Sequence, residues 1–208
     1  RGDRLRLELP AGTETIAIAY KTAPGALALG WLEPQQTAGG EHPFMFSQCQ
    51  PIHARTMIPC QDTPRHRVTY DATFTVPAPL RAVMSAAPAG DEPADDGRTA
   101  WRFTMPQPIP TYLLALAVGD LDFRPLGPKT GVYAEPQVIA RAAFEFADTE
   151  KMMEAAEALY QLAPGSLPAV YYLASVRLQQ VQPDLLDLNA ARRVLVCSRL
   201  KRTLNEVL

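Results

Sequence analysis

Four side chains between residues 49 and 66 have the chemistry of zinc ligands. Cys49, His53, Cys60 and His66 form the pattern C-x3-H-x6-C-x5-H, and thiolate and imidazole groups bind tetrahedral zinc. The spacing argues against a shared ion, because Cys49 and His53 would lie ~13 Å apart on an extended segment at about 3.3 Å per residue. The residues between them offer no glycine for a tight turn. We therefore expect ordinary core and loop residues here, with no metal ligands.

Two glutamines in the same region have a different chemistry. Gln48 and Gln50 lie on either side of Cys49, so on a strand both would point to one face. An amide can donate and accept hydrogen bonds to a peptide without acting as an acid or a base. On the residues alone, two interpretations stay open: a cradle for a peptide substrate, or hydrogen bonds at the edge of a strand.

Other common catalytic arrangements are absent from the sequence. The three histidines are not accompanied by a G-x-S-x-G nucleophile elbow. Gly25 and Gly30 have neither the lysine nor the spacing of a phosphate-binding loop. The sequence therefore predicts no catalytic residues of these kinds.

The composition is that of an ordinary globular protein. The 208 residues are 47% hydrophobic and 20% charged, with a net charge of −2, so we expect neither nucleic acid nor a membrane as a partner. Three cysteines without a C-x-x-C pair favour a reducing compartment, and we expect a cytoplasmic protein. The chain opens at Arg1 inside a strand pattern, and we expect a longer native protein, truncated at the front here.

The elements that position these residues are predicted to be short strands. Twenty prolines disfavour long helices. Alternating hydrophobic residues predict strands at 3–9, 16–20, 27–31, 68–76, 80–86 and 101–105, and an apolar run predicts one at 113–118. The acidic residues between Gly90 and Gly97 predict an exposed hairpin loop.

The hydrophobic period changes to that of a helix after Pro136. Apolar residues at helical spacing continue to residue 159, with Asp148 or Thr149 as the expected N-cap of a second helix and Glu150 in its first turn. A third composition follows Tyr160: one helix is predicted over 170–181, and another carries Cys197 on its apolar stripe and basic residues elsewhere. The expected division is a β-rich domain at 1–123, the start of another domain at 124–160, and a helical tail of unknown origin at 161–208.

Several motifs in register resemble one family. The runs TETIAIAYKTAPGALALGWLEPQQT, EHPFMFSQCQPIHARTMIPCQDTP, VPAPLRAVMSA and MPQPIPTYLLALAVGDLDFRPLGPKTGVYAEP are similar to the N-terminal domain of zinc aminopeptidases of the leukotriene A(4) hydrolase and aminopeptidase N family. The similarity runs in order over residues 1–160. It implies a mainly β, saddle- or sandwich-like domain followed by helical segments and the first part of a thermolysin-like catalytic domain.

The resemblance also implies a function. Members remove N-terminal residues from peptides, and some open a leukotriene epoxide. The positions of Gln48, Gln50 and Pro51 border the substrate pocket in the family, so these three are the expected substrate-binding residues. A catalytic domain is implied as the natural packing partner.

The sequence departs from the family after Tyr160. The expected G-x-M-E-N and H-E-x-x-H motifs do not occur in it. The chain alone is therefore expected to be inactive and without a cofactor, with zinc present only in the full-length enzyme. The alternative hypothesis is a non-catalytic β-sandwich binding module whose basic tail helix docks a partner. The residues leave open whether the enzyme is a peptidase or also an epoxide hydrolase.

Overall fold

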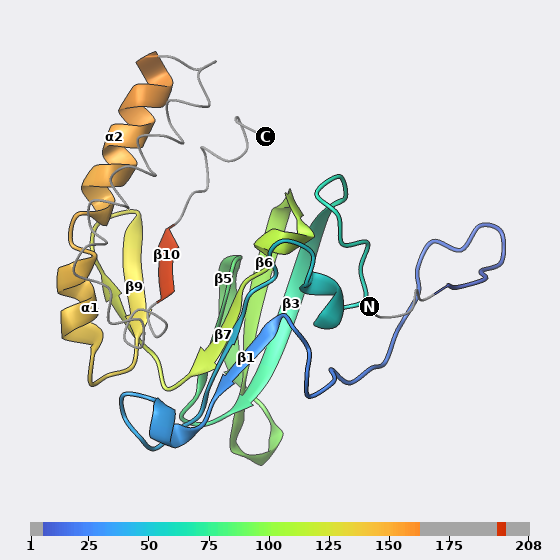
Figure 1. Cartoon of the computed structure of the whole chain (residues 1–208), viewed down its shortest axis with the longest axis horizontal. Coiled ribbons are helices and arrows are strands. Elements are labelled where there is room, and N and C mark those ends of the chain that lie inside the picture. Colours follow the sequence, from blue (N-terminus) through green and yellow to red (C-terminus); the bar gives the residue numbers. More distant parts are fainter. Residues whose placement is uncertain (1–5, 163–194, 199–208) are drawn as a thin grey trace.

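The computed structural model describes residues 6–162 and 195–198. Strands of three antiparallel β-sheets form most of the regular secondary structure in this part of the chain, which also contains two α-helices (Figure 1). The structure confirms the predicted fold class, a mainly β domain followed by α-helical segments.

The first sheet has four short strands in the order β1-β2-β7-β4. The strands are Leu29–Leu32 (β1), Phe44–Ser47 (β2), Leu116–Gly119 (β7) and Arg81–Met84 (β4). Gly119 lies directly against an aromatic ring, because a Cβ atom there would be 2.5 Å from the ring of Phe44. A larger residue at this position would push the ring away from the core.

The second sheet contains the two longest strands. Its order is β3-β6-β5, with bounds Arg67–Pro77 (β3), Arg98–Pro110 (β6) and Ala87–Pro93 (β5). The side chains of β3 alternate between exposed and at least partly buried, as the sequence predicts. The prediction of a loop over 90–97 is only partly right, because Asp91 and Glu92 belong to β5. Only Ala94 and the tight turn of η3 (Asp95–Gly97) separate β5 from β6. Because Asp91 and Glu92 pair with β6, the strand β5 continues into the acidic segment, where no hydrophobic pattern predicts a strand.

The main core lies between these two sheets. Val76 and Phe103 from the second sheet and Ala82 and Met84 from the first belong to one buried cluster. The segment after β2 contributes further members, namely Cys49, Ala54 and Met57. A sandwich core of this kind forms because each sheet buries its apolar face against the other.

The strands predicted at 3–9 and 16–20 are not found among the described residues, which begin at residue 6. Residues 6–28 contain no strand, and the alternating apolar side chains are exposed, namely Leu7, Leu9, Ile16, Ile18 and Tyr20. Alternation supplies an apolar face, but a strand also needs a neighbour to accept its backbone hydrogen bonds. No such neighbour lies beside this segment in the described part of the chain.

Two further strand predictions are shifted along the chain. β1 begins at Leu29 and not at residue 27, and the run at 113–118 divides into the 3-10 turn η4 (Thr111–Leu113) and β7. An apolar run is compatible with both a turn and a strand, so hydrophobicity alone does not fix where pairing starts.

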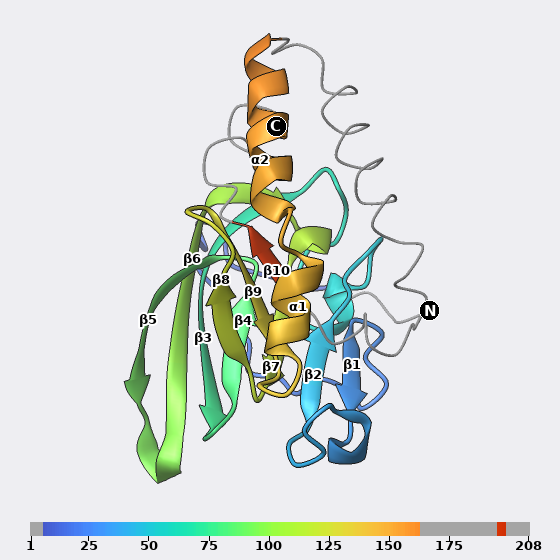
Figure 2. The same cartoon turned by 90° about the vertical axis from the view of Figure 1, so that its left-hand side faces the viewer.

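The third sheet packs against the first of the two helices. Its order is β10-β9-β8, with bounds Leu195–Ser198 (β10), Thr130–Ala134 (β9) and Asp122–Pro125 (β8). Helices α1 (Ile139–Glu145) and α2 (Thr149–Leu162) follow β9. Ala142 of α1 is buried against Val132 and Ala134 of β9, and Figure 2 shows α1 lying across this sheet.

Two features of α2 agree with the sequence. The helix begins at Thr149, directly after Asp148, with Glu150 in its first turn. The main-chain oxygen of Asp148 accepts a hydrogen bond from the N–H of Met152 at 3.0 Å. An acidic residue in this position is stabilised by the positive end of the helix dipole.

The predicted tail helices fall mostly outside the described residues. The exception is Leu195–Ser198, which pairs with β9 as strand β10. The prediction that Cys197 lies on a helical stripe is therefore wrong for these four residues. The exposed edge of β9 offers backbone hydrogen bonds that compete with a local helix.

A buried carboxylate joins the third sheet to the first. Glu135, directly after β9, is only 5% exposed. Its two oxygens accept hydrogen bonds from the main-chain N–H groups of Ala38 and Gly39, at 3.0 and 3.1 Å. The loop between β1 and β2 is thus held by a residue almost a hundred positions later in the chain.

Candidate functional site

The predicted substrate-binding residues lie around one hollow. Gln48, Gln50 and Pro51 line a depression of about 550 Å³ together with Pro64 and Tyr112. Gln48 and Gln50 are exposed, whereas the intervening Cys49 is 1% exposed. The two amides and the cysteine therefore point in opposite directions, as expected for the 48–50 spacing.

Local hydrogen bonds fix the segment that carries these residues. Gln48 follows β2, and its N–H donates to the main-chain oxygen of Ala28 at 2.7 Å. The N–H of Ala28 donates in turn to Oγ1 of Thr56 at 2.9 Å. Thr56 closes η2 (Ala54–Thr56), so both ends of the segment are tied to the start of β1.

The two glutamines have different surroundings. Oε1 of Gln48 accepts a hydrogen bond from the main-chain N–H of Gln50 at 3.0 Å. The amide of Gln48 thus supports its neighbour's backbone as well as facing the hollow. For Gln50, the side chain lines the hollow and is exposed.

A buried aspartate lies behind the hollow. Asp62 is 3% exposed. Its Oδ2 accepts hydrogen bonds from the main-chain N–H and the Nε of Arg55, at 3.0 and 3.3 Å, and its Oδ1 accepts one from Oγ1 of Thr111 at 2.7 Å. Burial raises the pKa of Asp62, but the hydrogen bonds from Thr111 and Arg55 outweigh burial and hold the pKa below its ordinary value.

The comparisons with known proteins identify this framework. The model of the peptidase M1 N-terminal domain matches residues 6–113. The chain belongs to this family. Leukotriene A-4 hydrolase of Xenopus laevis is 45% identical over 166 residues, which are 76% of this chain and 27% of that protein. Leucine aminopeptidase 2 of Aspergillus fumigatus is 42% identical over 165 residues, 75% of this chain and 26% of that protein.

A solved relative has the same fold. The structure of native leukotriene A4 hydrolase from Saccharomyces cerevisiae superposes with a TM-score of 0.56 and 39% identity, covering 65% of this chain and 20% of that one. The chain thus spans about a quarter of the length of the curated relatives it matches. The family resemblance read from the sequence motifs is confirmed.

The cysteines near the hollow belong to the core of the M1 domain. Cys49 and Cys60 are free thiols, and Cys60 packs against the cluster that contains Cys49. Burial raises the pKa of Cys49, and burial with the nearby charge of Asp62 raises the pKa of Cys60 to about 11. Both groups are therefore protonated near neutral pH, whereas metals and electrophiles react with thiolates.

No metal-binding group is found in the described part of the domain. Within residues 6–162 and 195–198, no three His, Cys, Asp or Glu side chains could hold an ion together. These described residues thus do not fit the zinc that the family implies. None of the helices in the described residues has the length and hydrophobicity of a membrane span.

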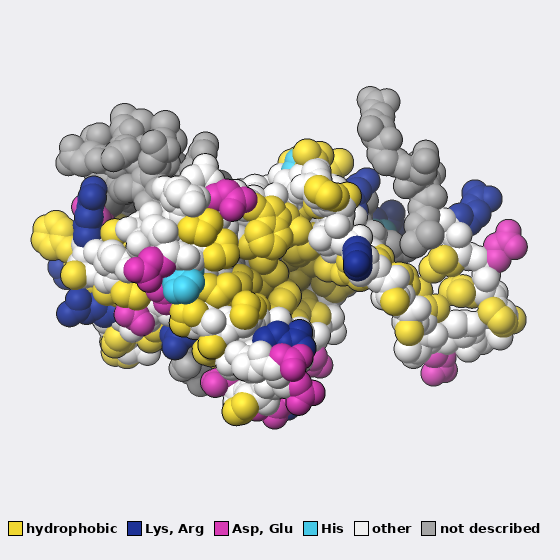
Figure 3. Space-filling view, turned by 90° about the horizontal axis from the view of Figure 1, so that it is seen from below, with side chains coloured by type: hydrophobic (Ala, Val, Ile, Leu, Met, Phe, Trp, Pro, Cys, Tyr) yellow, Lys and Arg dark blue, Asp and Glu magenta, His cyan; other side chains and the backbone are white. Residues whose placement is uncertain are grey.

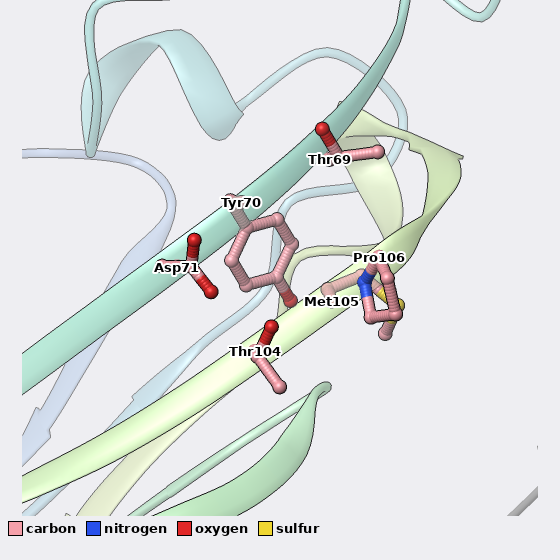
Figure 4. A pocket seen from close by; sticks show the side chains of 6 residues that line it. All are labelled: Thr69, Tyr70, Asp71, Thr104, Met105 and Pro106. Atoms are coloured by element: carbon pink, nitrogen blue, oxygen red, sulfur yellow. The ribbon is translucent and has the colours of Figure 1, made fainter.

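Another hollow of about 510 Å³ lies on the second sheet of the M1 domain. Figure 4 shows its lining from β3 and β6, namely Thr69, Tyr70, Asp71, Thr104, Met105 and Pro106. It lies next to the irregular pairing between Val68 and Tyr70. The hydroxyl of Tyr70 donates to the main-chain oxygen of Ser85 at 2.8 Å, so this tyrosine holds the two sheets together.

Two residues of the first hollow are absent from the sequence-based prediction. Pro64 and Tyr112 line it beside the glutamines, although Tyr112 is 62 positions from Gln50 in the chain. Nothing in the spacing or composition around Tyr112 distinguishes it from a core aromatic residue. Its place at the hollow depends on η4, a turn that the sequence does not predict and of which it assigns only the last residue, Leu113, to a strand.

The hydrogen bonds of Asp62 predict acid-sensitive stability. Its pKa is lower in the folded chain than in the unfolded one, so this stabilisation is complete above the ordinary aspartate pKa of about 3.9. It is lost as the pH falls through the lower folded pKa. We expect the stability difference between the wild type and Asp62→Asn to be largest near neutral pH and to shrink toward pH 3. Urea unfolding of both proteins between about pH 3 and 7 measures this difference. A constant difference over the whole range would contradict the prediction.

Proposed function

We propose that this chain supplies a wall of the substrate pocket in a zinc-dependent aminopeptidase that removes N-terminal residues from peptides. The observation that carries the proposal is the convergence of Gln48, Gln50 and Pro51 on one hollow of an M1 N-terminal domain. Two neutral amides can bind the main chain or the terminus of a peptide. Pro51 adds an apolar surface beside them.

The proposed organisation has three parts. Residues 1–123 form the N-terminal domain, residues 124–160 begin the catalytic domain, and residues 161–208 form a tail of unknown origin, whose strand β10 pairs with β9. The boundary falls inside β8 (Asp122–Pro125), which pairs with β9 of the next part. The free thiols Cys49 and Cys60 support a cytoplasmic location.

Catalysis is proposed to need residues beyond this chain. The sequence lacks H-E-x-x-H and G-x-M-E-N, and zinc is proposed for the full-length enzyme alone. The role assigned to residues 48–51 is therefore binding and orientation of the peptide.

The decisive experiment uses a hybrid enzyme in which this domain replaces the matching domain of a relative. Residues 6–160 would replace the matching segment of Xenopus laevis leukotriene A-4 hydrolase, and release of N-terminal residues from tripeptides would be measured. We expect a peptidase whose activity depends on Gln48 and Gln50. A well-folded, zinc-loaded hybrid that releases no N-terminal residue would contradict the proposal.

The isolated chain is expected to bind no stoichiometric zinc and to cleave no aminoacyl-arylamide. The reason is the absence of both catalytic motifs together with the protonated state of the thiols of Cys49 and Cys60. Metal analysis of the purified chain and an arylamide assay test this. One tightly held zinc per chain that disappears in Cys60→Ser would show that the prediction is wrong.

If a catalytic domain normally covers one face of this domain, the purified chain without it should self-associate. Hydrophobic side chains gather across the middle of the face seen in Figure 3. Large apolar side chains are also exposed around β1, where the exposed fraction is 63% for Trp31 and 71% for Leu27. Exposed apolar surface drives association, so we expect the purified chain to self-associate. Sedimentation velocity measures this. A monodisperse monomer that binds no apolar dye would count against the proposed catalytic-domain interface.

A further inference from the structure

Three separate segments form the walls of the hollow at Gln48 and Gln50. The first runs from β2 through Pro51 into η2, the second is the turn that contains Pro64, and the third is η4, which contains Tyr112. No strand pairing joins η4 to either of the other two segments. Strand pairing reaches only the edges of these segments, with Arg67 opposite Pro110 and Met45 opposite Val118. A further contact lies between the walls themselves.

The Asp62 carboxylate meets all three segments. It binds η2 through two hydrogen bonds from Arg55, and it lies two residues before Pro64 in the second segment. Its other oxygen binds Thr111, the residue directly before Tyr112. Thr111 is fully buried and Asp62 nearly so, so water does not compete for this bond. The guanidinium of Arg55 also donates to the main-chain oxygen of Asp62, at 2.6 Å.

The lining of the hollow divides into a polar and an apolar part. Gln48 and Gln50 offer amides, which suit the main chain of a peptide. The rings of Pro51, Pro64 and Tyr112 offer apolar surface in the same hollow. Tyr112 is partly exposed, and an aromatic side chain is the largest apolar contact that this wall offers.

We propose that Asp62 is a positioning residue for this hollow, and that Tyr112 is the specificity-determining residue it places there, its ring packing against an apolar side chain of the bound peptide. The second half rests on the proposed function. The first half concerns the geometry of this chain and holds whatever the hollow binds.

The positioning role is tested on the full 208-residue chain. Tyrosines are replaced by 3-fluorotyrosine, and the fluorine NMR signal of Tyr112 is assigned by its loss in Tyr112→Phe. Thr111→Val removes the hydrogen bond to Asp62 but keeps the shape of the side chain. We expect it to shift or broaden the Tyr112 signal. Thr111→Ser keeps the hydroxyl, and its Tyr112 signal should match that of the wild type. Thr75→Val, on the exposed side of β3, is the matched control and should leave the signal unchanged.

The specificity role is tested in the hybrid enzyme with tripeptides that carry Leu or Ala at each position in turn. We expect Tyr112→Ala to reduce the preference for Leu about tenfold at one position, since apolar contacts discriminate on that scale. Thr111→Val should raise KM and leave kcat nearly constant, because it loosens the wall without touching the reacting atoms.

The outcomes separate the two proposals. An unchanged Tyr112 signal in folded Thr111→Val overturns the positioning role, even if the hybrid is an active peptidase. An unchanged Leu preference in an active Tyr112→Ala hybrid overturns the specificity role. A hybrid that releases no N-terminal residue refutes the proposed function and with it the role of Tyr112 in peptide specificity, whereas the fluorine result still decides the role of Asp62.

Discussion

Replacing Phe103 with alanine should lower the free energy of unfolding by about 3–5 kcal/mol. Phe103 lies on β6, is 6% exposed and belongs to the core cluster between the two large sheets. Its ring lies 6.2 Å from that of Phe74 on the neighbouring strand. The substitution removes apolar burial and leaves a cavity that the sandwich cannot close.

Phe144 provides the matched control for this measurement. Its side chain is 80% exposed on α1, so Phe144→Ala should change stability by less than about 1 kcal/mol. Urea unfolding followed by tryptophan fluorescence gives both values. Equal losses for the two variants would mean that the described core is not the one that stabilises the chain.

Gln50→Ala in the hybrid enzyme should lower kcat/KM. The expected loss corresponds to about 1–3 kcal/mol of transition-state stabilisation, the range for one or two lost hydrogen bonds. An amide can hold the substrate but cannot exchange protons with it. Zinc content and the pH profile should therefore stay unchanged. Gln48→Ala should also weaken binding, because its amide oxygen accepts the N–H of Gln50.

Gln35 serves as the control for the glutamine substitutions. It is exposed in η1 (Pro34–Gln36), outside the hollow, and Gln35→Ala should leave kcat/KM as it is. Full activity of the Gln48→Ala and Gln50→Ala double variant would leave only the strand-edge interpretation of these residues. A shifted pH profile would instead show that the substitutions disturb the catalytic groups.

Sequence patterns predict the parts of the fold that depend on local periodicity. The alternation from Val68 to Val76 gives β3, and the helical spacing after Pro136 gives α1 and α2. The pattern fails at Ile16 and Ile18, since a strand depends on a neighbour that alternation does not specify. It fails again at Asp91, where pairing with β6 carries an acidic segment into a sheet.

In the candidate site too, local spacing predicts some features, whereas others depend on tertiary contacts. The spacing of Gln48 and Gln50 predicts a shared face, because that depends on two neighbouring residues. The contribution of Tyr112 depends on a hydrogen bond between Asp62 and Thr111, which are 49 positions apart in the chain. A tertiary contact of this kind leaves no periodic signal in a single sequence.

Glu135 limits how this module can be exchanged between relatives. Its carboxylate holds the loop at Ala38 and Gly39, so the matched family segment, residues 6–113, is not a self-sufficient unit for transplantation. A graft cut at residue 113 or 123 would leave two main-chain donors of that loop without their acceptor. Recombination between homologous genes faces the same restriction. A crossover that keeps this loop must also carry the acidic residue after β9, unless the recipient gene already encodes one at that position.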